Sequence, residues 1–295
     1  MTVTVIAVTY NSAESLPAFF AGVRRATMGI DHRLVIVDNA STDRTAELVA
    51  EFGPAAELVE MPGNRGYAAG INAGLQHSAG GPVLLLNPDI TLRPDSLAVL
   101  LAASERPGVG IAVPQLRGAD GGLQYSLRRE PRIRRVVGEA VLGGRRAGRS
   151  GWGEMVTAPE RYSRAGTADW ATGACLLVSA ECVRAVGPWD ERYFLYSEET
   201  DFLLRARDAG FALRYEPGAV AEHVGGEAHT SPRLFALLTV NRWRFYRSRH
   251  NLVAAGIFRA ALVLDALPRA AVGRATYRAG LAALLSRRLS RWSVE

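Results

Sequence analysis

The amino-acid sequence predicts an α/β fold built on a parallel β-sheet, and two observations carry that prediction. Short apolar runs alternate with segments of helical spacing through the first hundred residues. The run at 83–86 is apolar throughout, as expected of a parallel strand that helices cover on both faces. The chain has 295 residues, 48% of them hydrophobic and 22% charged. That size and composition suit one large domain, or one domain with an appendage.

Each expected element has a local signal. Apolar, β-branched runs predict strands over residues 2–10, 32–40, 56–62 and 83–86. Helical spacing predicts helices over residues 13–26, 41–50 and 67–77. After residue 108 the pattern loosens. A strand is expected over 110–117, and the arginine- and glycine-rich segment 127–154 has poor periodicity, which predicts a functional flap.

The later elements are expected in a similar way. Residues 168–179 predict a strand with Gly173 at a point of close approach. Residues 197–210 predict a helix with Ser197 as its N-cap and Gly210 as its stop. A strand pair should follow and end at His223. Beyond it, arginines alternate with apolar residues at helical spacing, so residues 228–295 are expected to form basic amphipathic helices.

The charge is unevenly distributed. All 35 basic residues are arginine, which excludes a Schiff-base lysine and a lysine-bearing phosphate loop. Residues 228–295 hold 12 arginines against two acidic residues, a net charge of +10, while the other residues hold 23 against 27, a net charge of −4. The basic segment is expected to meet an anionic membrane surface, or to pack on the catalytic part or on a second subunit, which leaves an oligomer open. The acidic body and the lack of a nucleic-acid motif argue against nucleic acid as a partner.

The sequence also suggests a compartment. Two cysteines, Cys175 and Cys182, are too few for a disulfide framework, which fits a reducing cytosol. No signal peptide and no run of 18 apolar residues is recognised. We therefore expect a cytoplasmic protein, peripheral at the inner face of the cell membrane if its C-terminal segment binds lipid.

Polar residues follow four of the expected strands, where ligands of α/β sheets bind. These residues are Thr9, Tyr10, Asn11, Asp38, Asn39, Asn64, Asn87 and Asp89. Any one of them could simply start a turn or cap a helix. A carboxylate such as Asp89 can hold Mg²⁺ or Mn²⁺ against substrate phosphates, and His223 is a candidate partner.

Two further segments carry candidate chemistry. Glu198 and Glu199 begin the helix at 197–210 beside an aromatic stretch, which can desolvate a carboxylate and raise its pKa toward that of a general base. Complementarity to the helix dipole is the alternative explanation. The glycine-rich segment 63–74 lacks the GxGxxG spacing of a dinucleotide site, although amides at the start of its helix could face phosphate.

Together these stretches resemble the family 2 glycosyltransferases, and most closely their rhamnosyltransferase-like branch. The matching stretches span about residues 3–226 and occur in the family's order: VTYNS, VDNASTDRT, GNRGYAAGINAGL, LLLNPDI, WATGACLLV, VGPWDERYFLYSEETDF and AEHVGG. The resemblance implies a GT-A fold over residues 1–227. It assigns residues 1–110 to the nucleotide-sugar-binding half and 111–227 to the acceptor-binding half, with 228–295 as an appended segment.

The resemblance also implies residue roles. Nucleotide-sugar binding falls to Thr9, Tyr10, Asn11, Asp38, Asn39, Asn64, Arg65, Gly66, Asn72, Asn87 and Asp89. Acceptor binding falls to Trp170, Thr172, Gly173, Trp189 and Asp190. Asp89 and His223 would hold the metal, with Asn87 where the family's DxD motif has its first aspartate. Glu199 would be the catalytic base, with Glu198 as the alternative, because this chain has Glu-Glu where the family has an ED motif.

The implied activity is metal-dependent, inverting sugar transfer to a hydroxyl in cell-envelope polysaccharide synthesis. The branch suggests L-rhamnose from dTDP-L-rhamnose, passed to a glycan or a polyprenyl-diphosphate-linked acceptor. An arginine from residues 128–149 is expected to assist at the diphosphate. UDP-linked GlcNAc or galactose remains the alternative donor, and a non-catalytic nucleotide-binding scaffold the alternative class. The presence of Asp89, Glu199 and His223 together argues against the scaffold.

Overall fold

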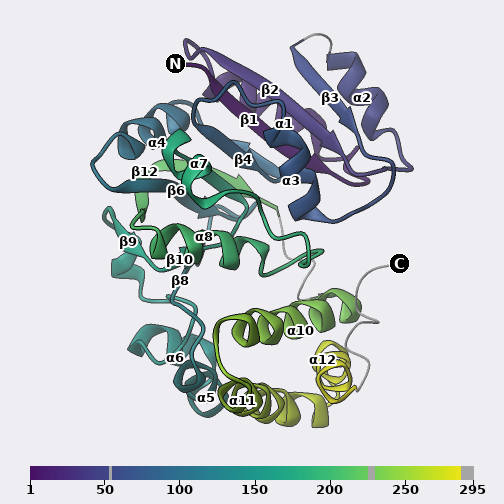
Figure 1. The fold of residues 1–295 in the computed structure, drawn as a ribbon, viewed down its shortest axis with the longest axis vertical. Coiled ribbons are helices and arrows are strands. Elements are labelled where there is room, and N and C mark those ends of the chain that lie inside the picture. Colours follow the sequence, from purple (N-terminus) through teal and green to yellow (C-terminus); the bar gives the residue numbers. More distant parts are fainter. Residues whose placement is uncertain (53–54, 225–229, 287–295) are drawn as a thin grey trace.

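The computed structural model describes residues 1–52, 55–224 and 230–286. A mixed β-sheet with helices on both faces fills the upper part of the molecule in Figure 1, and three C-terminal helices lie at the opposite end. The expected α/β class is thus confirmed.

The first half of the chain follows the expected alternation of strands and helices. Its elements are β1 (Val3–Thr9), α1 (Leu16–Ala26), β2 (His32–Asp38), α2 (Thr45–Phe52), β3 (Ala56–Glu60), α3 (Tyr67–Leu75), β4 (Val83–Leu86), β5 (Ile90–Leu92), α4 (Ser96–Ser104) and β6 (Val109–Arg117). The strand order along the sheet is β3-β2-β1-β4-β11-β6-β12-β5. The first four strands in this order are parallel, as expected, whereas β11 (Cys175–Val178) runs antiparallel to both β4 and β6.

The fully apolar strands separate two hydrophobic cores. Every residue of β1 is buried, and its side chains alternate between the two faces of the sheet. Val3, Val5 and Ala7 pack with α1 and α4, while Ile6 and Val8 pack with α3 and α8 (Glu198–Asp208). Because both faces are covered, the open edge for a ligand is the carboxyl end of the strands.

The glycine-rich segment 63–74 has a packing role. A Cβ on Gly70 would lie 2.5 Å from Val8 Cγ1, and one on Gly74 would lie 2.6 Å from Ile6 Cγ2. These glycines, one helical turn apart, allow α3 to lie directly on β1. The start of α3 is close to a loop as well, since a Cβ on Gly66 would lie 2.2 Å from the carbonyl oxygen of Phe194.

The second half differs from the sequence prediction in four places. Its elements are β7 (Leu123–Gln124), β8 (Leu127–Arg128), α5 (Ile133–Leu142), α6 (Gly144–Ser150), a short 3₁₀ helix (Pro159–Arg161), β9 (Gly166–Ala168), β10 (Trp170–Ala171), β11, α7 (Ala180–Val186), α8 and β12 (Ala212–His223). The segment predicted to be irregular contains two helices. The predicted strand at 168–179 is three short strands, because it turns between two sheets. The predicted strand pair is one long strand with register irregularities. Ser197 occupies the N-cap position of α8 but makes no side-chain capping hydrogen bond.

The C-terminal segment is helical, as expected. It forms α10 (Pro232–Arg249), α11 (Leu252–Ala271) and α12 (Ala275–Leu285), with Ser231 and Asn251 capping the first two. The three helices pack on one another, and α11 also packs on α5 (Figure 1). The expected boundary at 227/228 lies outside the described residues. In the parts of the chain that the structure describes, no helix is both long enough and apolar enough to cross a membrane.

A matched pair of glycine substitutions should distinguish the close contact in α3 from ordinary helix propensity. Gly70→Ala is expected to destabilise the protein by about 1–3 kcal/mol, because Val8 has little room to move. Gly256→Ala lies in exposed α11 with open space around its Cβ, and should stabilise by about 0.5–1 kcal/mol. Urea unfolding followed by circular dichroism measures both. Changes of the same sign would contradict the packing role of Gly70.

Candidate active site

The ends of β1 and β2 form one wall of the candidate nucleotide site. Thr9 Oγ1 donates a hydrogen bond of 3.0 Å to Asp38 Oδ1, and the backbone N–H of Ser41 donates to Asp38 Oδ2 at 3.0 Å. Thr9 and Asp38 are both buried. The structure therefore brings these two predicted residues together and fixes the Asp38 carboxylate at the sheet edge.

An amide network extends this wall. Asn39 Nδ2 donates to Asn64 Oδ1 at 2.9 Å and to the Gly66 carbonyl at 3.1 Å. The backbone N–H of Arg65 donates to Asn39 Oδ1 at 3.0 Å. The turn before α3 is thus held against the end of β2. Tyr10 is half exposed beside it, and Asn11 has a positive φ of 50° and accepts a hydrogen bond from the N–H of Thr42.

Four of the predicted contact residues make contacts within the protein. Both ends of the Asn72 amide bind the backbone of Trp189, at 2.9 Å each, and Arg65 pairs with Glu191 at 2.9 Å. The Trp189 ring is buried and stacks on Phe202. Asp190 pairs with Arg192, whose hydrogen bonds lower the pKa of Asp190. Asn72, Arg65, Trp189 and Asp190 therefore brace the loop before α8, and their roles as ligand contacts stay predictions.

Asp89 and His223 meet at the far side of the sheet edge. The pairing of β12 with β5 sets His223 opposite Ile90, and Asp89 Oδ2 lies 3.5 Å from His223 Nε2. Asn87 turns the chain here, and its N–H donates to the Ala174 carbonyl at 2.9 Å. Gln124 Nε2 donates to the His223 carbonyl at 2.9 Å, which directs Gln124 Oε1 to His223 Nδ1 at 3.0 Å. Because Gln124 Oε1 can only accept, Nδ1 carries a proton, and Nε2 is the ring nitrogen that faces Asp89.

This pair fits an open site for a divalent cation. One carboxylate oxygen and one imidazole nitrogen face each other, and Gln124 fixes the imidazole as a metal-bound histidine requires. Within residues 1–52, 55–224 and 230–286, no group of three or more His, Cys, Asp or Glu side chains could enclose a metal. Such a site would take its remaining ligands from substrate phosphate and water, as is usual for Mg²⁺.

Two glutamates begin α8. Glu198 is 3% exposed, and one carboxylate oxygen each of Glu198 and Glu199 is buried without a hydrogen-bond partner. Burial and the carboxylate of Glu199 raise the pKa of Glu198 well above its ordinary value. Burial also raises the pKa of Glu199, but the positive charge of Arg128 opposes the rise. The pair thus favours a protonated Glu198 beside a Glu199 that ionises first.

The loop before α8, which leads into Glu199, has an unusual backbone geometry. Tyr196 and Ser197 have consecutive positive φ values of 68° and 76°. Asn241 of α10, fully buried, donates hydrogen bonds to the carbonyls of Leu195 at 2.9 Å and Tyr196 at 3.2 Å. On the other side, a Cβ on Gly173 would lie 3.1 Å from Glu199 Cβ, so this glycine admits the glutamate.

Glu199 opens onto a cavity of about 760 Å³ between the catalytic part and the C-terminal helices. Trp170, Thr172 and Arg128 also line it near Glu199. The opposite wall is mostly apolar and comes from α10, α11 and α12 through Phe235, Leu238, Leu262, Ala266 and Tyr277. Of the predicted acceptor residues, the structure therefore brings Trp170 and Thr172 to the cavity, with Gly173 behind Glu199.

Four residues that the sequence did not single out contribute to this region. Gln124 orients His223, and Asn241 fixes the loop before α8. Arg128 is held by the carbonyls of Tyr125 and Leu127 and lines the cavity with Glu199. Burial raises the pKa of Tyr67, with further contributions from the charges of Glu198, Glu199 and Asp89, so Tyr67 lies near both acidic centres. Only the placement of Arg128 in an arginine-rich segment was a usable sequence signal.

Comparison with known proteins agrees with this arrangement. The sequence profile described as Glycosyl transferase family 2 matches residues 4–156. The N-acetylglucosaminyl-diphospho-decaprenol L-rhamnosyltransferase of Mycobacterium tuberculosis is 32% identical over 241 residues, which cover 78% of this chain and 77% of that protein. This chain belongs to glycosyl transferase family 2. It is a glycosyltransferase, and within the family it is rhamnosyltransferase-like.

Solved structures share the fold. The mannosyltransferase PcManGT from Pyrobaculum calidifontis, in complex with GDP-Man and Mn²⁺, has a TM-score of 0.58 at 20% identity over 98% of this chain and 82% of that one. S. aureus TarS has a TM-score of 0.56 at 13% identity over 96% of this chain. This chain spans only 55% of the TarS chain. The expected GT-A fold with added C-terminal helices is confirmed.

Proposed function

We propose that this glycosyltransferase moves L-rhamnose from dTDP-L-rhamnose to a hydroxyl of a polyprenyl-diphosphate-linked saccharide, with inversion, in cell-envelope polysaccharide synthesis. The observation that carries the chemistry is the Glu199 carboxylate at the head of the 760 Å³ cavity. The choice of sugar and acceptor is supported by the M. tuberculosis relative, which is an N-acetylglucosaminyl-diphospho-decaprenol L-rhamnosyltransferase. In this proposal residues 1–110 form the donor half, 111–227 the acceptor half, and 228–295 complete the acceptor cavity.

The donor would bind along the ends of β1, β2 and β4. Thr9, Asp38 and Asn64 offer the hydrogen-bonding edge for a pyrimidine nucleoside. Asp89 and His223 would hold a divalent cation against the diphosphate, where it would offset the charge that develops as the diphosphate leaves. UDP-GlcNAc or UDP-galactose remains the second candidate donor, because S. aureus TarS 1–349, which shares the fold, binds UDP and UDP-GlcNAc.

The chain's own residues would organise the transfer. The acceptor hydroxyl would lie in the cavity next to Glu199, which takes its proton as the oxygen attacks the anomeric carbon from the face opposite the diphosphate. Glu198, buried and protonated, would keep a second negative charge away from this oxygen. No covalent enzyme intermediate is needed, and one displacement inverts the anomeric centre.

The pH dependence of transfer should identify the base. Only ionised Glu199 can accept the proton, so kcat is expected to fall as the pH drops through its raised pKa, above the ordinary glutamate value of 4.5. Glu199→Gln should lower kcat by at least about 1,000-fold while leaving nucleotide affinity within a few-fold. Glu198→Gln mimics the protonated side chain and should keep both the activity and the acidic limb. An inactive Glu198→Gln beside an active Glu199→Gln would move the base to Glu198.

Isothermal titration calorimetry with dTDP and UDP, each with and without Mn²⁺, tests the donor and the metal together. We expect Mn²⁺ to tighten dTDP binding by about 10-fold or more, and Asp89→Ala to remove that gain. Glu105→Ala, which removes an exposed carboxylate after α4, is the control. Preference for UDP would change the donor and keep the enzyme class. Binding of neither nucleotide would favour the non-catalytic scaffold, and insensitivity to EDTA would exclude the metal site.

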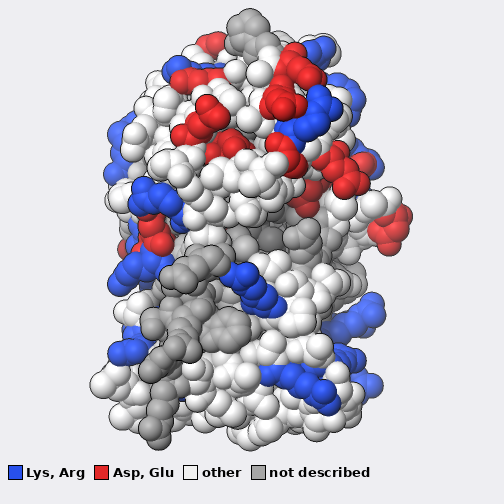
Figure 2. All heavy atoms as spheres, turned by 90° about the vertical axis from the view of Figure 1, so that its right-hand side faces the viewer, with Lys and Arg blue, Asp and Glu red and all other residues white. Residues whose placement is uncertain are grey.

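We further propose that the C-terminal helices rest on an anionic membrane surface. The exposed residues of α11 are all non-polar: Leu252, Val253, Gly256, Ile257, Ala260, Leu264, Leu267, Pro268 and Ala271. Between Thr230 and Ser286 the sequence has nine arginines and one acidic residue, Asp265, which pairs with Arg269 at 2.6 Å. The coloured residues on the lower part of the face in Figure 2 are blue, while red ones gather higher up. An apolar face with surrounding cations suits an anionic bilayer.

Sedimentation with phosphatidylglycerol vesicles tests this surface. Ile257→Glu combined with Leu264→Glu should weaken vesicle binding by about 10-fold or more. The two charged side chains cannot enter the apolar part of the bilayer as the exposed apolar side chains do. Met28→Glu, an equally exposed apolar site after α1, should have no effect. If the wild-type protein stays in the supernatant and forms a dimer that the double variant abolishes, α11 is a subunit interface instead.

A further inference from the structure

Three arginines on α6 lack the carboxylate partners that Arg242 and Arg269 have. Arg145, Arg146 and Arg149 are exposed, and no carboxylate of the described residues pairs with them. Arg242, by contrast, binds Glu139 at 2.9 Å and Glu154 at 2.6 Å, and Arg269 binds Asp265. The uncompensated positive charge of this region is therefore concentrated on α6.

The three arginines surround a hollow that joins the Glu199 cavity. This hollow has a volume of about 490 Å³, and Tyr125 and Thr157 line it together with the arginines. Tyr125, Thr157, Gly144 and Arg145 also line the 760 Å³ cavity. The hollow and the Glu199 cavity are therefore direct neighbours, with these four residues common to both.

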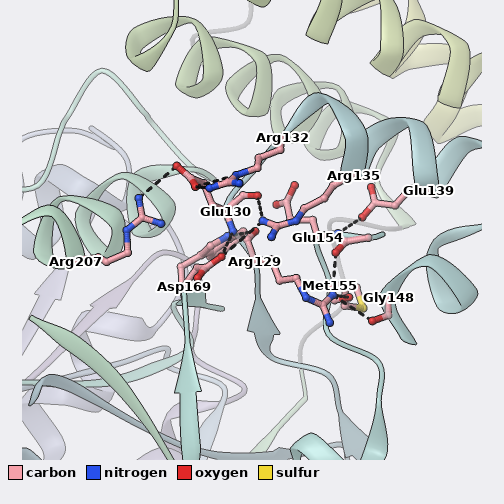
Figure 3. A network of polar contacts seen from close by, with 12 residues as sticks. Arg129, Glu130, Arg132, Arg135, Glu139, Gly148, Glu154, Met155, Asp169 and Arg207 are labelled. Atoms are coloured by element: carbon pink, nitrogen blue, oxygen red, sulfur yellow. Dashed lines mark hydrogen bonds and ion pairs between the residues drawn. The ribbon is translucent and has the colours of Figure 1, made fainter. Parts of the chain in front are cut away.

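The backbone of α6 is fixed in place. The guanidinium of Arg129 donates hydrogen bonds to the carbonyls of Gly148 at 3.1 Å, Gly153 at 2.9 Å and Met155 at 3.3 Å (Figure 3). A Cβ on Gly148 would lie 2.5 Å from the Met155 carbonyl oxygen. The arginines thus project from a backbone that is already held in place, so less backbone conformational entropy is lost when they bind a ligand.

We infer that Arg145, Arg146 and Arg149 bind the diphosphate of the acceptor. The inference rests on the proposed function, in which the acceptor is a diphosphate-linked saccharide lipid. With its reacting hydroxyl at Glu199, the saccharide fills the cavity and the diphosphate reaches the hollow on α6. Guanidinium groups match phosphate oxygens in charge and fork geometry.

The donor diphosphate does not account for this site. Thr9, Asp38, Asp89 and His223 mark the donor edge, and none of them lines either the hollow or the Glu199 cavity. The α6 arginines therefore lie on the acceptor side of Glu199. The arginine-rich segment that was expected to assist at the donor diphosphate would thus serve the acceptor through α6.

Two acceptors that differ only in the diphosphate test the inference. One is the undecyl diphosphate ester of N-acetylglucosamine, and the other is its undecyl glycoside, which carries no phosphate. Wild-type enzyme should prefer the first by about 10- to 100-fold in kcat/KM, mainly through KM, as expected for charge-assisted hydrogen bonds. The triple variant Arg145→Ala, Arg146→Ala, Arg149→Ala should reduce this ratio to near one, chiefly by raising KM for the diphosphate ester, with dTDP affinity unchanged. Arg106→Ala, an exposed arginine after α4, is the control.

The outcomes separate the two proposals. Equal use of both acceptors by wild-type enzyme, or an unchanged ratio in the triple variant, overturns the diphosphate site and leaves the proposed transfer intact. If neither acceptor is glycosylated, calorimetric binding of the diphosphate ester in saturating dTDP decides. Binding that the triple variant loses supports the site although the proposed transfer has failed. Binding that the variant keeps, or no binding by the wild type, overturns the site. Single substitutions at Arg146 and Arg149 serve if the triple variant does not fold.

Discussion

The burial of two adjacent carboxylates at the start of α8 is the constraint on which the rest of the site depends. An ionised carboxylate in such surroundings is costly unless it is paired, so burial favours a protonated carboxyl group in this pair. The preceding residues Tyr196 and Ser197 both have positive φ, at a cost of about 1–3 kcal/mol each. Neighbouring elements must therefore hold this geometry in place. Asn241 does so from α10, and the N–H of Tyr67, which donates to the Phe194 carbonyl at 2.8 Å, does so from α3.

Charge pairing around the cavity leaves Glu199 distinct from its neighbours. Glu139 and Glu154 share Arg242, and Asp265 pairs with Arg269. Among the described carboxylates that line the cavity, Glu199 alone forms no ion pair, because Arg128 directs its guanidinium to backbone carbonyls. A carboxylate in an ion pair is a weak proton acceptor, since its charged form is already stabilised. Among the described carboxylates of this cavity, Glu199 is therefore the one that accepts a proton most readily.

The sequence predicted the elements whose signals are local. β1 and β4 read as unbroken apolar runs because helices cover both of their faces, and Thr9 meets Asp38 because parallel strands end at one edge. It missed α5 and α6, since the apolar face of α5 is defined by its partner α11, more than a hundred residues away. Gln124 and Asn241 act on residues 99 and 46 positions distant, and nothing in a single sequence marks such pairs. Trp189 and Asn72 match the family motifs, but the motifs did not indicate that Trp189 stacks on Phe202 or that Asn72 binds the backbone of Trp189, since these contacts join distant segments.

The same kind of long-range contact joins the C-terminal segment to the candidate active site. Two successive residues of α10 serve different parts of the site, because Asn241 binds the loop before α8 and Arg242 binds Glu139 of α5 and Glu154. Without α10, the carbonyls of Leu195 and Tyr196 would lose these hydrogen bonds, and two buried carboxylates would lose their cation. Unpaired buried groups of this kind cost about 1–3 kcal/mol each, and more when charged. The segment is therefore a structural part of the candidate active site, and a GT-A unit ending at residue 227 would lack the contacts that hold the loop before Glu199 in place.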